Sequence, residues 1–168
     1  MIQVGSTLYG DRHGDRFGYS LSLNGNGTVL VVGSPSASHE GDLSGLVRVF
    51  RLESNEWQQL GQDIGDSSTG DAMGHDVSVS LDGLMVATSA YVANGAPGID
   101  CGVVRVYTFV NQTWSLCGQP IFGGAAFDYL GHSISLSGNG SVLAVGATAY
   151  ESFDKAGYVN VYQLRRVE

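Results

Sequence analysis

Charged side chains are scarce in this chain, and basic ones are the scarcest. Asp, Glu, Lys and Arg make up 14% of the 168 residues, and Lys155 is the only lysine; typical soluble domains carry roughly 25% charged residues. Eight Lys and Arg against sixteen Asp and Glu leave a formal net charge of -8. Because this charge repels phosphate backbones and anionic lipids, we expect neither nucleic acid nor a membrane surface as a partner.

Long apolar runs, paired cysteine motifs and catalytic motifs are also missing. No apolar run approaches the roughly 18 residues of a membrane span, so membrane insertion is not expected. A hairpin centred near Asn111 would place Cys101 opposite about residue 120, so Cys101 and Cys117 are predicted to be free thiols. Because the usual hydrolase, zinc and nucleotide-binding motifs are absent, we predict no enzymatic activity, no cofactor and no metal.

Glycine, in contrast, is abundant, and the sequence repeats itself. The 25 glycines are about twice the usual share of roughly 7%. Three copies of one pattern are anchored at Gly18, Gly74 and Gly131, which recur at nearly equal intervals along the chain. Each copy holds four short strand-like runs. We therefore predict a single all-β domain over 1–168, with repeats at approximately 9–64, 65–121 and 122–168, the last completed by 3–8.

The first run of each repeat alternates large and small side chains. In 17–23, Phe, Tyr, Leu and Leu alternate with Gly, Ser and Ser. A sheet that is bulky on one face and small on the other suits stacking of sheets face to face. The Asn-Gly and Asp-Gly pairs in 24–27, 82–83 and 138–140 predict tight hairpins after these runs.

Stacked four-stranded repeats predict β-propeller blades. Phe17-Gly18 with Val31-Val32-Gly33-Ser34-Pro35 resembles the FG-GAP repeat of the integrin α-subunit propeller, and Leu130-Gly131 with Val145-Gly146-Ala147 is a looser match. The resemblance implies propeller blades, an extracellular adhesion or ligand-binding role toward a protein or glycan, and calcium in an aspartate-rich loop. Here that loop offers Asn24, Asn26, Asp82 and Asn139, too few carboxylates for calcium, so we expect none there.

Three blades are too few to close a ring, since propellers have four to eight. The chain begins with a fourth-strand run at 3–8 and ends without one after Tyr158–Leu164. We therefore predict a homodimer that forms one six-bladed ring, in which residues 3–8 of each copy pair with the last strand of the other. A segment of a longer propeller and a closed β-trefoil are the alternatives.

The loops on one rim gather most of the acids. Ten of the sixteen acids fall there, namely Asp11, Asp15, Glu40, Asp42, Asp66, Asp71, Asp100, Asp128, Glu151 and Asp154. Loops are also where charges stay hydrated. We predict a non-catalytic binding or assembly module that presents this acidic rim; a carbohydrate-binding lectin and a propeller-type lyase or hydrolase are the alternatives.

Seven residues are candidates for ligand binding. Asp15, Asp71 and Asp128 each stand three residues before an anchor glycine, where they either accept backbone N–H bonds or form a ring of carboxylates. His75 and His132, matched by Tyr19, share the large face, and packing between blades is favoured over a metal site. Asp76 replaces a serine on the small face, so it faces the channel or has a partner.

Overall fold

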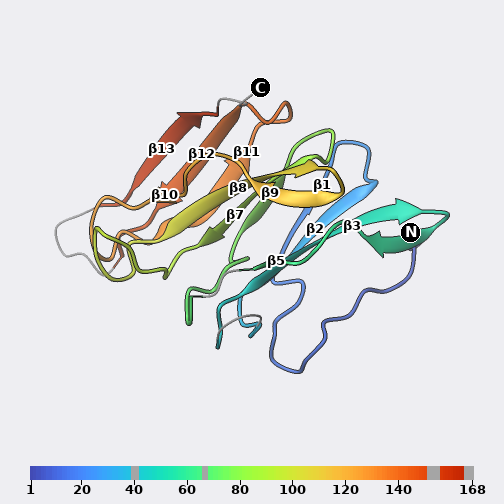
Figure 1. Ribbon diagram of the computed structural model, residues 1–168, viewed down its shortest axis with the longest axis horizontal. Helices are drawn as coiled ribbons and strands as arrows, with labels where there is room; N and C mark the ends of the chain where they lie inside the picture. Colours follow the sequence, from blue (N-terminus) through green and yellow to red (C-terminus); the bar gives the residue numbers. More distant parts are fainter. Residues whose placement is uncertain (39–41, 66–67, 151–155, 165–168) are drawn as a thin grey trace.

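The computed structural model describes residues 1–38, 42–65, 68–150 and 156–164. These residues form thirteen β-strands in three antiparallel sheets, and they contain no helix that could cross a membrane (Figure 1). The all-β prediction is confirmed. Cys101 and Cys117 are free, as expected, with Cys101 buried.

Each sheet corresponds to one sequence repeat. The first contains β1 (Ser20–Leu23), β2 (Val29–Ser34), β3 (Leu46–Glu53), β4 (Glu56–Gln59) and β5 (Ile64–Gly65). The second contains β6 (Val77–Val79), β7 (Met85–Ala90), β8 (Val103–Val110), β9 (Thr113–Leu116) and β10 (Ile121–Phe122). The third contains β11 (Leu130–Leu136), β12 (Val142–Ala147) and β13 (Tyr158–Gln163). Within each sheet, consecutive strands up to the third are hydrogen-bonded neighbours.

The fourth strand of each repeat differs from the prediction of one continuous run. It breaks at Gly61 and Gly118, both of which have φ of +76°, so the first two sheets have five short strands instead of four. A backbone in the left-handed region cannot continue a strand. Residues 3–8 form no strand, and the third sheet has only three strands among the described residues.

The first strands begin later than predicted. β1 starts at Ser20 and β6 at Val77, because the anchor glycines Gly18 and Gly74 have φ of +87° and +86°. In the third sheet, the register of β11 shifts between Leu130 and Ser133 around the same anchor position. The anchor segments are therefore turns that enter the strands.

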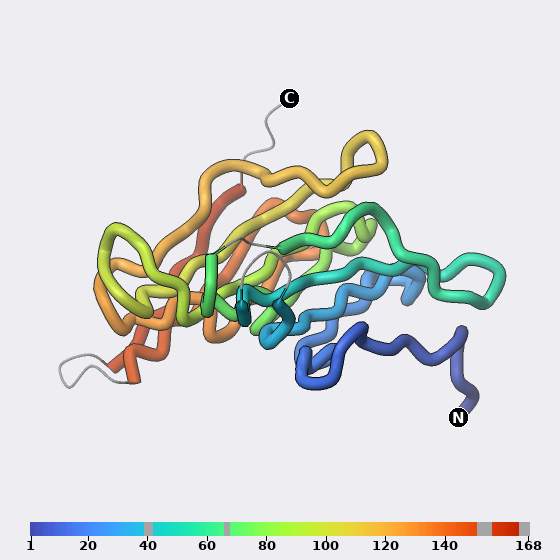
Figure 2. Tube along the Cα trace, turned by 60° about the horizontal axis from the view of Figure 1, so that its bottom comes forward, coloured from blue at the N-terminus to red at the C-terminus, as the bar shows by residue number. Residues whose placement is uncertain are grey.

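The three sheets stack side by side in chain order (Figure 2). One apolar core fills each junction. Val31, Val47, Met73 and Val77 belong to the core of the first two sheets, and a second core, which includes Leu130, joins the last two. Three separate stacked sheets agree with the predicted propeller blades. The β-trefoil alternative is wrong, because its strands would close one barrel.

Hydrogen bonds tie the first strands of neighbouring sheets together. The Ser20 hydroxyl donates to the Gly74 carbonyl (2.8 Å), and the Val79 N–H donates to Ser22 Oγ (3.1 Å). One sheet further on, the Leu136 N–H donates to Ser78 Oγ (2.9 Å). The small face thus supplies polar partners to the next blade, as well as room for it.

Glycine at the start of β8 allows the closest approach between the second and third sheets. Gly102 has φ of +79°, and a Cβ atom there would lie 2.2 Å from the Leu130 carbonyl oxygen. We expect Gly102→Ala to lower the free energy of unfolding by about 3 kcal/mol, because backbone strain and overpacking add. Chemical denaturation measures this.

The matched control is Gly70→Ala. Gly70 has a similar φ of +83°, but a Cβ atom there would meet nothing within 4 Å. This variant carries only the backbone strain, roughly 1 kcal/mol. Equal losses in the two variants would contradict the close sheet contact.

Candidate functional site

A row of aromatic and histidine rings crosses the three sheets at one rim. Tyr19, His75 and His132 each follow the anchor glycine of their repeat. The ring centroids of Tyr19 and His75 are 5.4 Å apart, and those of His75 and His132 are 5.2 Å apart. Stacked sheets bring equivalent positions together, so three of the seven candidate residues lie side by side. His75 is half-buried, whereas Tyr19 and His132 are exposed, and their role in ligand binding stays a prediction.

Loop tyrosines extend this row. The Tyr91 ring centroid lies 4.0 Å from that of His75 and 5.8 Å from that of His132. Tyr129 lies 6.1 Å from Tyr91 and stacks on Tyr150 at 4.5 Å. We call these six side chains, from Tyr19 to Tyr150, the aromatic row. Its end members Tyr19 and Tyr150 are exposed, whereas Tyr129 is buried.

The sequence interpretation missed Tyr91, Tyr129 and Tyr150. Tyr91 directly follows β7 and Tyr150 lies three residues after β12, so both occupy the loop between the second and third strands of a repeat. Loop residues carry no periodicity that marks their direction. The one available signal was this recurrence of tyrosine at nearly the same place in two repeats.

The packed environment shifts the acidity of the row. Burial lowers the pKa of His75, and the nearby His132 lowers it further, while Asp76 opposes the shift. Burial also raises the pKa of Tyr91. The neutral imidazole of His75 is therefore favoured in the folded protein.

The aspartates before the anchor glycines lie in the bends that enter the first strands. Asp15, Asp71 and Asp128 each precede a residue with positive φ. Asp128 accepts the N–H groups of Gly124 (2.8 Å) and Ala125 (3.0 Å). Asp15 accepts the Arg12 N–H (3.2 Å). For Asp15 and Asp128 these contacts match the alternative of backbone N–H acceptors.

Asp128 also anchors the last strand. The Tyr158 hydroxyl of β13 donates to its carboxylate (2.8 Å), and burial together with this bond raises the pKa of Tyr158 to about 12. Asp71 and Asp128 are both buried, while Asp15 is half-buried. The role of these three residues in ligand binding stays a prediction.

Asp76 has partners in two sheets. Its carboxylate accepts the Val77 N–H (2.9 Å) and, from the third sheet, the Ile134 N–H (2.7 Å). It occupies the ladder position that Ser20 fills in the first sheet. Of the two alternatives for Asp76, the structure shows the partner; binding of a ligand by Asp76 stays a prediction.

The acidic rim is partly neutralised by one arginine. Both side-chain oxygens of Asp63 accept bonds of 2.9 Å from Arg48, which also bonds to Asp11 and holds the pKa of Asp11 below its usual value. Four predicted rim acids, Glu40, Asp66, Glu151 and Asp154, lie outside the described residues. Within the described part of the chain, no three or more His, Cys, Asp or Glu side chains cluster as metal ligands.

Two tryptophans each cover a glycine of the preceding fourth-strand segment. The Trp57 indole N–H donates to the Val4 carbonyl (3.2 Å), and the Trp114 indole N–H donates to the Leu60 carbonyl (2.7 Å). Each ring lies against the glycine that follows its acceptor, Gly5 or Gly61. These tryptophans are packing residues.

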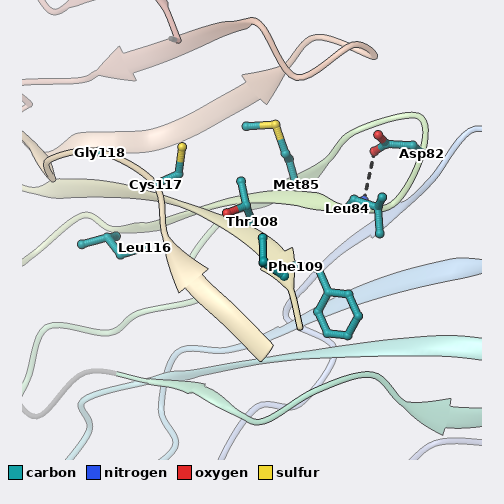
Figure 3. A pocket seen from close by; sticks show the side chains of 9 residues that line it. Asp82, Leu84, Met85, Thr108, Phe109, Leu116, Cys117 and Gly118 are labelled. Atoms are coloured by element: carbon teal, nitrogen blue, oxygen red, sulfur yellow. Dashed lines mark hydrogen bonds between the residues drawn. The ribbon is translucent and has the colours of Figure 1, made fainter. Parts of the chain in front are cut away.

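Where a third such ring would lie, the structure has a cavity of about 410 Å³ (Figure 3). Met85, Phe109, Leu116 and Cys117 contribute to its wall, and Gly118 lies beside Cys117. Cys117 is only partly buried, in contrast to Cys101. Asp82 and Thr108 add polar groups to a lining that is otherwise mainly apolar.

The two outer faces of the stack are left uncovered. On β1, Leu21 and Leu23 are 61% and 58% exposed, whereas the equivalent Val77 and Val79 on β6 are 5% and 8% exposed. At the other end, the β13 residues Val159 and Val161 are 69% and 66% exposed. Their equivalents in the first sheet, Val47 and Val49, are fully buried at 0%.

These features define part of a β-propeller: the sheets repeat, they stack side by side, and their first strands contact one another along the inner edge of the stack. No protein-family model and no curated protein matches the chain. Solved β-propeller structures do match it, and at their low sequence identities they establish the fold alone.

Three of these structures illustrate the match. Saccharomyces cerevisiae Sqt1 aligns with a TM-score of 0.57 and 16% identity over 98% of this chain and 36% of that chain. The complex of KlAtg21 with the coiled-coil of AgAtg16 aligns with a TM-score of 0.54 and 18% identity, over 86% of this chain and 38% of that chain. Kuenenia stuttgartiensis hydrazine synthase aligns with a TM-score of 0.52 and 13% identity, over 86% of this chain and 33% of that chain. The chain thus spans about a third of each of these three structures.

The lowered pKa of His75 predicts a loss of stability in acid. Because the unfolded chain binds this proton more readily, the contribution is complete above the unfolded value of about 6.5 and is lost as the pH falls through the lower folded value. We expect His75→Gln to flatten the fall in unfolding free energy between about pH 7 and pH 5. Urea denaturation at several pH values measures the slope.

His13→Gln is the control, because His13 lies in an exposed loop. It should keep the slope of the unmodified protein. If His75→Gln kept that slope too, the predicted coupling between His75 and folding would be wrong.

Proposed function

We propose that this protein is a non-catalytic assembly and binding module, two copies of which close one six-bladed ring. The observation that carries the proposal is the pair of uncovered, complementary faces at the two ends of the stack. The exposed leucines of β1 present the large face, and the exposed valines of β13 belong to the face on which large residues pack in the other junctions. An apolar surface of this kind on a soluble protein marks an interaction site.

Polar groups also match across the proposed junction. In the two junctions within the chain, a first-strand N–H donates to a serine hydroxyl of the preceding sheet. Ser135 is the equivalent serine of the third sheet and is exposed, and Leu23 is the equivalent donor of the first sheet. A second copy placed with the same repeat geometry would continue this ladder, because its Leu23 N–H would donate to Ser135 as the equivalent groups do within the chain.

Close backbone approach has the same complementarity. At the internal junctions, a Cβ atom on Gly74 or Gly131 would meet atoms of the preceding sheet within 3 Å. At Gly18 it would meet nothing within 4 Å. A hollow of about 470 Å³ beside Ser133, Gly146 and Val159 lies on the face where the Gly18 segment of a second copy would arrive. Gly18 therefore has the backbone conformation of Gly74 and Gly131, but no described residue packs against it.

The acidic rim and the aromatic row are the proposed binding surface of this ring. Their neighbouring position near the ends of the first strands would be repeated by the twofold axis, giving two copies of the site. We propose that the repeats are related to FG-GAP repeats, on the strength of Phe17-Gly18 and Leu130-Gly131. This relationship favours an extracellular protein or glycan as the ligand.

The ring is tested by its mass in solution. We expect sedimentation equilibrium at micromolar concentration to give twice the 17.6 kDa of one chain. Two junctions would bury roughly 2,000 Å² or more, the range of obligate dimers. The double variant Leu21→Asp with Leu23→Asp should weaken association at least 100-fold, because buried unpaired carboxylates would face apolar side chains.

The control is Leu43→Asp with Ile99→Asp, since both residues are similarly exposed but lie in loops. This variant should stay dimeric. A folded protein with the mass of a single chain at the same concentration, before any substitution, would refute the ring.

Carbohydrate binding is the second candidate, and the exposed tyrosines of the aromatic row favour it. Tyrosine offers an apolar ring face and a polar hydroxyl, which suits sugars. If the row is a lectin site, a glycan array should give a defined ligand, and Tyr150→Ala should weaken its binding at least tenfold. Tyr9→Ala, an exposed tyrosine outside the row, is the control. An array without binding, or equal effects of both variants, would exclude this candidate.

A further inference from the structure

We infer that the cavity at the end of β9 is the acceptor site for Met1 of a second copy of this chain. The first residues of that copy would add to β13 as the fourth strand of the third sheet. The inference rests on the proposed ring. It identifies a contact that would hold the N-terminal segment of one copy on the third sheet of the other. The same site is filled at two other places in the chain, at Gly5 and at Gly61.

In both filled sites an indole ring covers a glycine. A Cβ atom on Gly5 would lie 2.6 Å from the Trp57 ring, and one on Gly61 would lie 2.8 Å from the Trp114 ring. The two glycines have φ of +72° and +76°. In each case the ring comes from the fourth strand of the following sheet, β4 or β9, and donates to the carbonyl before the glycine.

The third site has the same backbone without the ring. Gly118 also has φ of +76°, but a Cβ atom there would meet nothing within 4 Å. The cavity of about 410 Å³ opens beside it, with Met85, Phe109 and Leu116 in its wall (Figure 3). Among the described residues, the second sheet therefore forms this site, and no side chain covers Gly118.

The repeat register identifies the residue that would enter. Trp57 and Trp114 stand three positions before Leu60 and Cys117. Val4 is the equivalent of Leu60, since its carbonyl accepts the next indole in the same way, and three positions before Val4 is Met1. Met1 therefore occupies the tryptophan position of the N-terminal fourth-strand segment.

The strand pairing gives the same answer. In the first sheet Phe50 pairs with Gln59, and Leu52 pairs with Trp57. At the equivalent positions of the third sheet, Tyr162 would pair with Gln3 of the second copy, and Leu164 would pair with its Met1. Tyr162 and Leu164 already pack against the second core. A strand in this register would direct its first side chain over Gly118.

The N-terminal segment of the same chain does not reach this site. Figure 1 shows the N-terminus beside the β3–β4 hairpin, at the opposite end of the stack from β13. There Val4 accepts the Trp57 indole, and the Gly5 N–H donates to Asn55 Oδ1 (3.3 Å). In the proposed ring the occupant belongs to a second copy, whose segment would bridge its own first sheet and the third sheet of its partner.

Methionine suits the cavity chemically. Its unbranched thioether chain fills irregular apolar spaces and makes favourable contacts with aromatic rings, here that of Phe109. In the sites at Gly5 and Gly61, the tryptophans fill the same space rigidly. The site also carries its own reporter, since the Cys117 thiol lines the cavity.

The test is a disulfide between copies. We would replace Met1→Cys in a chain released from a cleavable tag, oxidise the dimer mildly and locate the link by peptide mass spectrometry. We expect a disulfide between position 1 of one copy and Cys117 of the other in more than half of the chains. Ile2→Cys should link at least tenfold less, because successive strand residues point to opposite faces.

A second measurement uses the two cysteines already present in the chain. Deleting Met1 and Ile2 should speed alkylation of Cys117 at least tenfold, while Cys101 stays unreactive in its buried position. A dimer by sedimentation that forms no disulfide to Cys117, or in which the deletion leaves alkylation unchanged, would overturn this inference and leave the ring standing. A monomer by sedimentation would overturn both.

Discussion

The structure depends on one contact: the backbone of each sheet lies directly on glycine in the sheet before it. Gly45 pairs with Met73 through a parallel bridge, and a Cβ atom on Gly45 would lie 2.2 Å from Met73 backbone atoms. Gly102 meets Leu130 in the same way. This approach fixes both the spacing and the register of the sheets. The hydrogen-bonded ladder, the row of rings and the tryptophan sites repeat because the contact repeats.

The parts of this fold that follow local rules could be predicted from the sequence. The Asn24–Gly27 turn is one example: Asn24 Oδ1 accepts the Thr28 and Val29 N–H groups, a local contact that Asn provides. The break at Gly61 could not be predicted, because glycine fits either a strand or a left-handed turn. Here the ring that covers Gly61 belongs to Trp114, which lies in the next repeat of the sequence. The positions of Tyr91 and Tyr150 were missed for a related reason, since loops show no periodicity.

Residue type alone also could not separate structural from ligand-binding acids. Asp76 differs from the serines at its repeat position, which is a reason to suspect function. Its carboxylate nevertheless contacts the next sheet, as Ser20 does one sheet earlier: Asp76 accepts the Ile134 N–H, whereas the Ser20 hydroxyl donates to the Gly74 carbonyl. Asp128 likewise uses one oxygen for two backbone N–H groups and the Tyr158 hydroxyl. Both roles require the same carboxylate, so only the contacts distinguish them.

Whether a second copy closes a ring or extends a fibre depends on the rotation between sheets. The proposed contact joins two different faces, and such head-to-tail contacts close only when the rotation fits; six blades require about 60° per blade. The outer junction also differs from the inner ones. Phe17 stands where Met73 and Leu130 stand inside, and Tyr158 stands where Leu46 and Val103 stand. The Phe17 ring of a second copy would reach the hollow of about 470 Å³ beside Tyr158. There it would fill space that a smaller side chain, such as the Met73 or Leu130 of the inner junctions, would leave open. The outer faces are thus suited to each other rather than to a repeat of the inner junction, and the rotation between sheets then decides whether the proposed contact closes a pair or continues into an open chain.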